Sequence, residues 1–215
     1  MSNFFYTDSD IKNLDRRVRL KLINAVTGIK PGNLVGSMNS KGQTNLSVFS
    51  SVVHLGSDPA LLGMIMRPVE EVPRHTYQNI LETGYYTINH IHPTFVENAH
   101  YTSAKFDESI SEFDRCGLTA EFLENFDAPF VKESTFKMGM QFLQQIEIPQ
   151  NKTRLIIGEV KVLVLPEEAR VDGDIDLEQS RSIGISGLNS YYELRKLATF
   201  PYARTNEVPD FDNGS

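Results

Sequence analysis

The chain has 215 residues, 40% hydrophobic and 10% aromatic, which is enough apolar material for a sizeable core and argues against a disordered or fibrous protein. Its 28 Asp and Glu outnumber its 21 Lys and Arg, and the net charge of −7 disfavours nucleic acid and membrane surfaces as partners. No secretion signal or long apolar span is visible. The single cysteine, Cys116, excludes an intramolecular disulfide, so we expect a cytoplasmic location.

The first part of the chain predicts one helix and then strands. Apolar residues at near-helical spacing behind an acidic start indicate a short amphipathic helix from Ser9 to Asn24. The next predicted elements are strands at 33–39, from Thr44 onward and at 60–66, the last ending at Arg67. Gly42 lies in the turn between the first two strands, where it can take a positive φ.

The rest of the chain also consists mostly of predicted strands. Pro73 favours a helix start, and Gly84 lies where the C-terminal cap of that helix belongs. The later elements are a strand at 85–91, a helix at 94–102, a long β pair at 136–148 and 154–165, and a turn at 172–174. This order predicts a mainly β fold with helical additions (α+β), in which a closed or nearly closed antiparallel barrel removes exposed sheet edges. We expect one domain over residues 1–205 and a disordered tail over 206–215.

Small polar side chains are densest in the strand from Asn45 to Ser51. Alternation along a strand sends Asn45, Ser47, Phe49 and Ser51 to one face, and Leu46, Val48 and Ser50 to the other. The first face is mixed polar and aromatic, which suits a ring-shaped ligand. The alternative is a strand whose hydroxyls satisfy one another or water.

Basic residues flank the predicted helix start. Arg74, His75 and Thr76 follow Pro73, and free amides, the helix dipole, a guanidinium and a hydroxyl would together hold a phosphate. The alternative is ordinary capping by Thr76, with Arg74 in solvent. Arg67, at the end of an apolar strand, either contacts such a phosphate or extends its head group into water.

Other chemistry finds little support in the sequence. His90 and His92 could share a face, but no carboxylate or zinc spacing accompanies them, so we predict no metal site. Walker, GxGxxG, GxSxG and HExxH motifs do not occur. Cys116 has no identified base partner, and we assign no catalytic side chain.

The order of these features resembles the flavin reductase-like family, flavoredoxin-like relatives included. The segments that carry the resemblance are Asn45 to Ser51, Ser57-Asp58-Pro59, Arg67-Pro68, Arg74-His75-Thr76, Asn79-Ile80, Gly84 to Asn89, Ala99 to Phe106, Ser111-Glu112-Phe113, Gly117-Leu118, Ala128-Pro129 and Ile157 to Val160. They span roughly residues 20–165. The resemblance implies an FMN-binding split β-barrel of Greek-key type that works as a homodimer, with the flavin at the subunit interface.

The resemblance also implies which residues bind the cofactor. Around the ribityl chain and ring it places Asn45, Leu46, Ser47, Phe49, Ser50 and Ser51, and around the phosphate Arg67, Arg74, His75 and Thr76. Three departures stand out: Ala60 replaces a proline, His75 an acidic residue, and Asn151 to Gly158 a Gly-Asp-His element. The segment Ile185 to Tyr192 is similar to a Gly-x-x-Tyr-Tyr element of some flavoredoxin-like relatives, which implies a cover over the flavin.

The function implied is an oxidoreductase that takes a hydride from NADH or NADPH onto FMN and passes electrons to a small-molecule acceptor. Hydride transfer between stacked rings requires no side-chain acid or base. An FMN-binding electron carrier without NAD(P)H oxidation is the alternative, which the missing Gly-Asp-His element keeps open. A split barrel that holds heme or pyridoxine phosphate is a third hypothesis.

Overall fold

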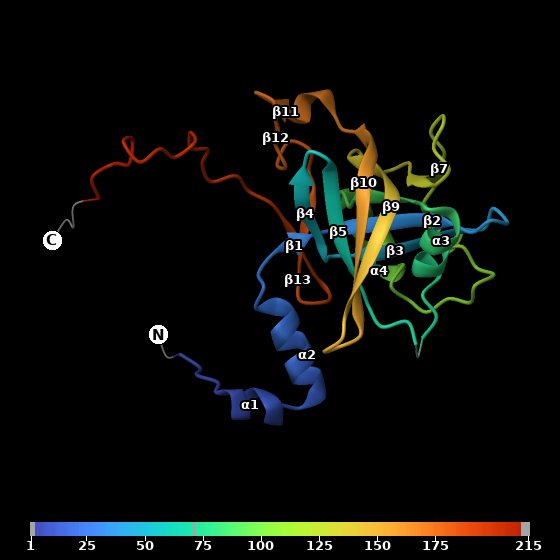
Figure 1. Ribbon diagram of the computed structural model, residues 1–215, viewed down its shortest axis with the longest axis horizontal. Helices are drawn as coiled ribbons and strands as arrows, with labels where there is room; N and C mark the ends of the chain where they lie inside the picture. Colours follow the sequence, from blue (N-terminus) through green and yellow to red (C-terminus); the bar gives the residue numbers. More distant parts are fainter. Residues whose placement is uncertain (1–2, 71, 212–215) are drawn as a thin grey trace.

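A computed structural model describes residues 3–70 and 72–211 and contains a seven-stranded antiparallel sheet (Figure 1). In spatial order its strands are β3 (Thr44–Phe49), β2 (Asn33–Met38), β6 (Tyr85–His90), β9 (Lys137–Ile148), β10 (Thr153–Val164), β5 (Ala60–Met66) and β4 (Val52–Ser57). The predicted strands at 33–39, 60–66 and 85–91 and the long β pair are confirmed to within a residue or two. The turn glycine Gly42 has the expected positive φ, 83°.

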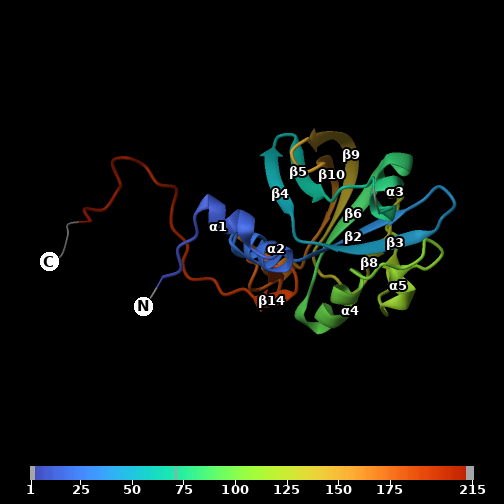
Figure 2. The same ribbon diagram turned by 90° about the horizontal axis from the view of Figure 1, so that it is seen from below.

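The connection between the two edge strands shows that this sheet is curled. β3 and β4 lie at opposite edges, yet only Ser50 and Ser51 separate them in the chain. A flat sheet of seven strands would hold its edges roughly 29 Å apart, whereas two linking residues span only about 11 Å. The sheet therefore bends into a barrel, as Figures 1 and 2 show, and the predicted antiparallel barrel with helical additions is confirmed.

Strand β4 was not predicted as a separate element. Val53, His54 and Leu55 are all exposed, so β4 lacks the alternation of a half-buried strand. It is held instead by its ladder to β5, which shifts register between His54 and Gly56. The sequence of β4 therefore lacks the alternation of apolar and polar residues by which a strand can be predicted.

Helices cover the barrel at two places. The helix α3 (His75–Thr83) packs on β2 and ends at Gly84, whose φ of 77° confirms the predicted C-terminal cap. On the other face of β3 lie η1 (Pro93–Phe95), α4 (Val96–Tyr101) and α5 (Glu112–Arg115). The first two agree with the helix expected at 94–102, whereas α5 was not predicted. None of the helices in the described residues has the length and apolar character needed to span a membrane.

The predicted single helix over residues 9–24 is wrong in one respect. The structure has two helices, α1 (Asp8–Asn13) and α2 (Arg16–Ala25), separated at Leu14 and Asp15. Asp15 is the N-cap of α2, and its carboxylate accepts hydrogen bonds from the amides of Arg17 and Val18. A side chain that caps a helix start interrupts any helix running through it.

Short strands complete the fold. One small sheet contains β1 (Lys30–Pro31), β13 (Ile183–Ser186) and β14 (Ser190–Glu193). Two others are the pairs β7 (Ala120–Glu121) with β8 (Phe130–Val131) and β11 (Arg170–Val171) with β12 (Asp174–Ile175). The short helix η2 (Glu167–Ala169) directly precedes β11. The predicted turn at 172–174 joins β11 to β12. In the expected tail, residues 206–211 form no helix or strand, and 212–215 lie outside the described residues. Disorder of this tail and the single-domain boundary at 205 stay predictions.

Candidate functional site

The polar strand β3 shows the predicted alternation. Leu46 and Val48 pack into a core with Leu34, under α4 and α5. Phe49 packs against the second core, inside the barrel, and Asn45 faces the same way, toward α3. Ser50 and Ser51 lie beyond the end of the strand. They form the link to β4, where the carbonyl of Ser51 accepts a hydrogen bond from the amide of Ile65 at 3.0 Å.

The structure brings the polar strand and the start of α3 together. The amide nitrogen Nδ2 of Asn45 donates to Oγ1 of Thr76 at 2.8 Å, and to Oγ of Ser37 at 3.4 Å. Asn79, one turn further along α3, donates to the same Ser37 hydroxyl at 3.1 Å. Two segments that the sequence treats separately, around residues 45 and 76, therefore form one corner of the molecule.

The N-terminus of α3 has no side-chain cap among the described residues. Its N-cap residue is Arg74, which makes no capping hydrogen bond, so capping by Thr76 is wrong. The first turn contains no acidic residue. The amide of Gln78 makes the first intrahelical bond, to the carbonyl of Arg74, which leaves the preceding amides of the turn without an intrahelical acceptor. Such an end attracts an anion.

Two arginines lie near this helix end: Arg74 is its N-cap residue, and Nε of Arg74 donates to the carbonyl of Pro68, the neighbour of Arg67, at 3.4 Å. The pKa of Arg74 is lowered, first by burial and then by the positive charge of nearby Arg67. Neither guanidinium forms a salt bridge within residues 3–70 and 72–211. We call Arg67, Arg74 and the α3 N-terminus the anion corner. Two like charges held together favour a bound anion that neutralises both.

The segment between α4 and α5 also borders this site, next to β3 and the start of α3. The sequence analysis did not predict that this segment lies here. Oγ1 of Thr44 lies 2.7 Å from Oγ of Ser111. Hydrogen bonds from Ser109 lower the pKa of Asp107, and the nearby imidazole of His75 contributes to the same shift. His75 therefore faces this segment. The pattern Ser111-Glu112-Phe113 was the signal that pointed there, but nothing local reveals which strand it meets.

Glu112, the first residue of α5, is buried, with 6% of its surface exposed. Its Oε2 accepts a hydrogen bond from the amide of Leu46 at 3.0 Å, and burial raises the pKa of its carboxyl group. Leu46 thus has its side chain in the core and its amide occupied. A role for Leu46 in ligand binding stays a prediction, as it does for the other residues expected around the ring.

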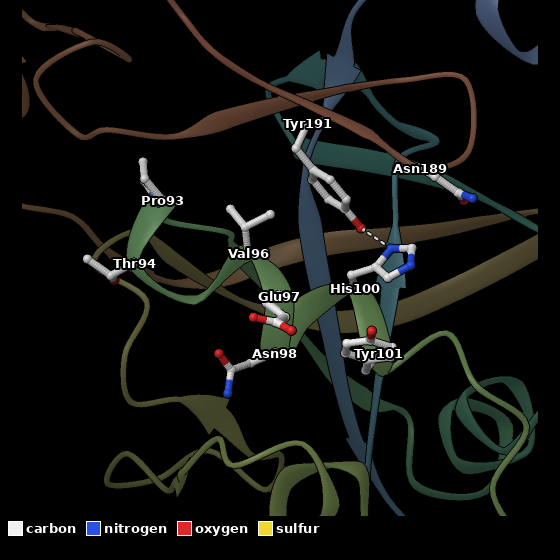
Figure 3. A pocket seen from close by; sticks show the side chains of 9 residues that line it. All are labelled: Pro93, Thr94, Val96, Glu97, Asn98, His100, Tyr101, Asn189 and Tyr191. Carbon is white, nitrogen blue, oxygen red and sulfur yellow. Dashed lines mark hydrogen bonds between the residues drawn. The ribbon is translucent and has the colours of Figure 1, made fainter.

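A groove of about 540 Å³ lies apart from the anion corner, between α4 and the loop that leads into β14 (Figure 3). His100 and Tyr191 meet in it, with Nδ1 and the phenol oxygen 2.9 Å apart. Burial raises the pKa of Tyr191. Its lining residues are Pro93, Thr94, Val96, Glu97, Asn98, His100, Tyr101, Asn189 and Tyr191. The Gly187 to Tyr192 segment therefore contributes to this groove, and its expected role over the flavin is untested.

The remaining candidates of the sequence have internal partners. His90 lies against Ser182, with 2.8 Å between Nδ1 and Oγ, and burial lowers the pKa of His90 to about 4. Among the described residues, no group of three or more His, Cys, Asp and Glu side chains could hold a metal ion. Cys116 is buried, and burial and the charge of Glu112 raise the pKa of its thiol.

Most of the chain is similar to known proteins. The family model of the flavin reductase like domain matches residues 29–176. A solved structure from Shewanella frigidimarina NCIMB 400, of a candidate flavin reductase with a split barrel domain, is 44% identical in sequence. The match covers 94% of this chain and 100% of that one, with a TM-score of 0.89.

More distant proteins are similar over most of the chain. Flavoredoxin of Desulfovibrio vulgaris (Miyazaki F) is 24% identical, with 82% of this chain and 92% of that chain covered and a TM-score of 0.71. An uncharacterized protein of Aquifex aeolicus (strain VF5) is 24% identical over 185 residues, which are 85% of this chain and 92% of that protein. The resemblance read from the motifs is confirmed: the chain belongs to the flavin reductase-like domain family and has its split β-barrel fold.

Proposed function

We propose that this protein binds FMN and works as an NAD(P)H-dependent flavin reductase that passes electrons to a small-molecule acceptor. One observation carries the proposal. Two arginines and an uncapped helix end form the anion corner, and the hydrogen bond between Thr76 and Asn45 joins that corner to the polar strand β3. A phosphate site connected to a polar and aromatic strand face suits a flavin mononucleotide.

The residues present fit this cofactor. The phosphate of FMN carries nearly two negative charges at neutral pH, which matches the two guanidinium groups and the free amides of the first turn of α3. Ser47 and Phe49 are partly open on the polar face, where they would contact the ribityl chain and the ring. A phosphate site alone would also suit pyridoxine phosphate, so the family membership decides between the two cofactors.

When bound, the flavin supplies the two-electron chemistry, and the chain has to bind, orient and shield it. Arg67 and Arg74 would hold the phosphate in place. Phe49 would exclude water from the ring. Hydride transfer from a nicotinamide needs no proton shuttle, so we assign no side chain as catalytic.

The homodimer is part of the proposal. In a single chain Ser51 is exposed and Phe49 only half-buried, so the polar strand face is not closed by its own chain. A second copy placed against it would complete the site, with the flavin at the subunit interface. We also place the protein in the cytoplasm, because its one cysteine is a free, buried thiol.

An FMN-binding electron carrier without NAD(P)H oxidation is the second candidate function. It is favoured by the turn between β9 and β10, where Asn151, Lys152 and Thr153 stand in place of the Gly-Asp-His element. A nicotinamide that finds no binding surface there would leave the flavin oxidised.

An anaerobic absorbance experiment separates the two functions. The purified protein is saturated with FMN, and its flavin bands are followed after addition of NADH, then of NADPH, with dithionite as the positive control. Bleaching by either nicotinamide is the expected result. Bands that bleach only with dithionite establish the carrier, and a protein that does not bind FMN overturns both.

A further inference from the structure

We propose that both ends of the chain form arms that grip the barrel of a second copy. The N-terminal arm is residues 3–29 and the C-terminal arm is residues 195–211. The inference rests on the homodimer of the proposed function and adds which segments hold it together. It follows from four features of a single chain: unburied helices, exposed aromatic rings, opposite charges on arm and barrel, and an apolar patch on the barrel.

The N-terminal arm has helices but no core. Neither α1 nor α2 has a buried residue, and Val18, Leu20 and Ile23 of α2 are 50%, 51% and 46% exposed. An isolated helix shorter than about 12–15 residues is only marginally stable in water. The ten residues of α2 therefore need a surface to pack against, and none of them is buried against its own chain.

The C-terminal arm is apolar and lacks regular structure. Leu197, Phe200 and Tyr202 are 93%, 84% and 86% exposed, and residues 195–211 contain no helix or strand. Figures 1 and 2 both show the two arms leaving the barrel on the same side. One partner surface could therefore receive both.

The area these arms expose is that of a stable dimer. Their most exposed aromatic residues are Phe4, Phe5, Phe200, Tyr202 and Phe211. An aromatic side chain buries about 150–250 Å², so these rings together offer on the order of 800 Å². That equals one partner's share of a standard protein interface, about 800 Å². A monomer rarely leaves so much apolar surface in water.

The charge of the N-terminal arm favours this chain as its own partner. Residues 3–29 contain five Lys and Arg and three Asp and Glu, a charge of +2, while the whole chain carries −7, so the rest of the chain carries −9. Arg16, Arg17, Arg19 and Lys21 all lie on α2. An anionic membrane would attract the arm but repel the rest of the chain, whereas a second copy offers the arm a partner of opposite net charge.

The barrel has a matching apolar patch on its outer face. Its members are Val53 and Leu55 of β4, Leu155 of β10 and Ile146 of β9, which we call the barrel patch. Leu155 pairs with Ile146, and Val53 pairs with Gly63. A side chain at Gly63 would meet Leu55 and Leu155, so this glycine keeps the patch continuous and flat. Val53, Leu55 and Ile146 are 49%, 42% and 49% exposed.

The test measures the dimer dissociation constant of the full chain by sedimentation velocity. The arm variant is Phe200→Ser with Tyr202→Ser, and the patch variant is Ile146→Ser; these side chains are exposed in one chain, so folding should be kept, and circular dichroism checks it. Phe122→Ser, an aromatic 52% exposed near β7 and outside both surfaces, is the matched control.

We expect at least tenfold weaker dimers for the arm and patch variants and an unchanged constant for Phe122→Ser. Arg16→Glu with Arg17→Glu, or higher salt, should also weaken the dimer. An unchanged dimer dissociation constant in the arm variant would contradict the role of the arms in the dimer and would leave the FMN function intact. A wild-type monomer overturns the arms and the dimer together, and co-sedimentation of that monomer with anionic vesicles would identify lipid as the occupant. FMN titration of the same samples reports separately on the proposed function.

Discussion

Two polar clusters in this protein differ in how their charges and hydrogen bonds are satisfied. The first, which we call the histidine seam, is His90, Ser134, Ser180 and Ser182. Ser182 lies 2.8 Å from both His90 Nδ1 and Ser180 Oγ, and the hydroxyl of Ser134 donates to the carbonyl of His90 at 2.7 Å. Each of these side chains thus has a partner within the chain, and the seam joins the barrel to the segment before β13.

The anion corner has the opposite character. Arg67 and Arg74 share one sign of charge and form no salt bridge with the described carboxylates, and the α3 N-terminus beside them lacks a cap. A polar cluster that is satisfied internally serves the fold. A cluster of like charges lowers the stability of the fold through electrostatic repulsion, and a bound anion offsets that repulsion. The four predictions below test this contrast, from the largest expected effect to the smallest.

The double variant Arg67→Ala, Arg74→Ala should lose FMN. Hydrogen bonds to charged groups contribute about 1.5–3 kcal/mol each, so the dissociation constant should rise by roughly 100-fold or more, measured by flavin fluorescence titration. The midpoint temperature of thermal unfolding without FMN should not fall, because the substitutions remove two charges that repel each other. Arg170→Ala, on the exposed strand β11, is the control. An unchanged FMN affinity would contradict the assignment of the corner.

The histidine seam should respond to pH rather than to FMN. Burial lowers the pKa of His90 from 6.5 to about 4. As pH falls from 6.5 toward 4, the unfolded chain therefore takes up a proton that the folded chain refuses, and stability is lost by up to about 3 kcal/mol. Urea unfolding at pH 7 and pH 4.5 measures this loss. His90→Gln should flatten the dependence and the exposed His54→Gln should not; equal profiles would refute the buried, neutral imidazole.

Glu112 shares features with both clusters, because it is a buried acidic residue whose carboxyl group accepts one hydrogen bond from a backbone amide. Glu112→Ala should cost about 1–3 kcal/mol of unfolding free energy, since it leaves the buried amide of Leu46 without an acceptor. Glu112→Gln keeps an acceptor and should cost less. Because the carboxyl pKa is raised in the fold, wild-type stability should fall as pH rises above 4.5, and the Gln variant should lack this fall. Equal losses in both variants would show that the hydrogen bond to Leu46 is unimportant.

The smallest effect concerns Cys116. Its buried thiol has a raised pKa, and the thiolate is the reactive form. Alkylation at pH 8 should be at least about tenfold slower in the native protein than in urea, as followed by mass spectrometry. Rapid labelling of the native chain would mean that this region opens readily.

The sequence predicted those parts of the site that depend on local pattern. The alternation of β3 placed Leu46 and Val48 opposite Phe49, and Gly84 marked the end of α3, because both are set by neighbouring residues. Glu112 was missed because it meets Leu46 across 66 residues. The alternative in which Thr76 caps α3 is wrong, because its hydroxyl instead accepts from Asn45 across 31 residues. Long-range contacts of this kind have no signature in a single sequence.

A comparison of FMN with riboflavin tests the central claim most directly. The two differ only in the phosphate, so titration of the wild-type protein with each measures what the anion corner contributes. We predict that FMN binds at least 100-fold more tightly, and that Arg67→Ala with Arg74→Ala abolishes most of this difference. Equal affinities for the two flavins in the wild-type protein would contradict a phosphate site at the start of α3.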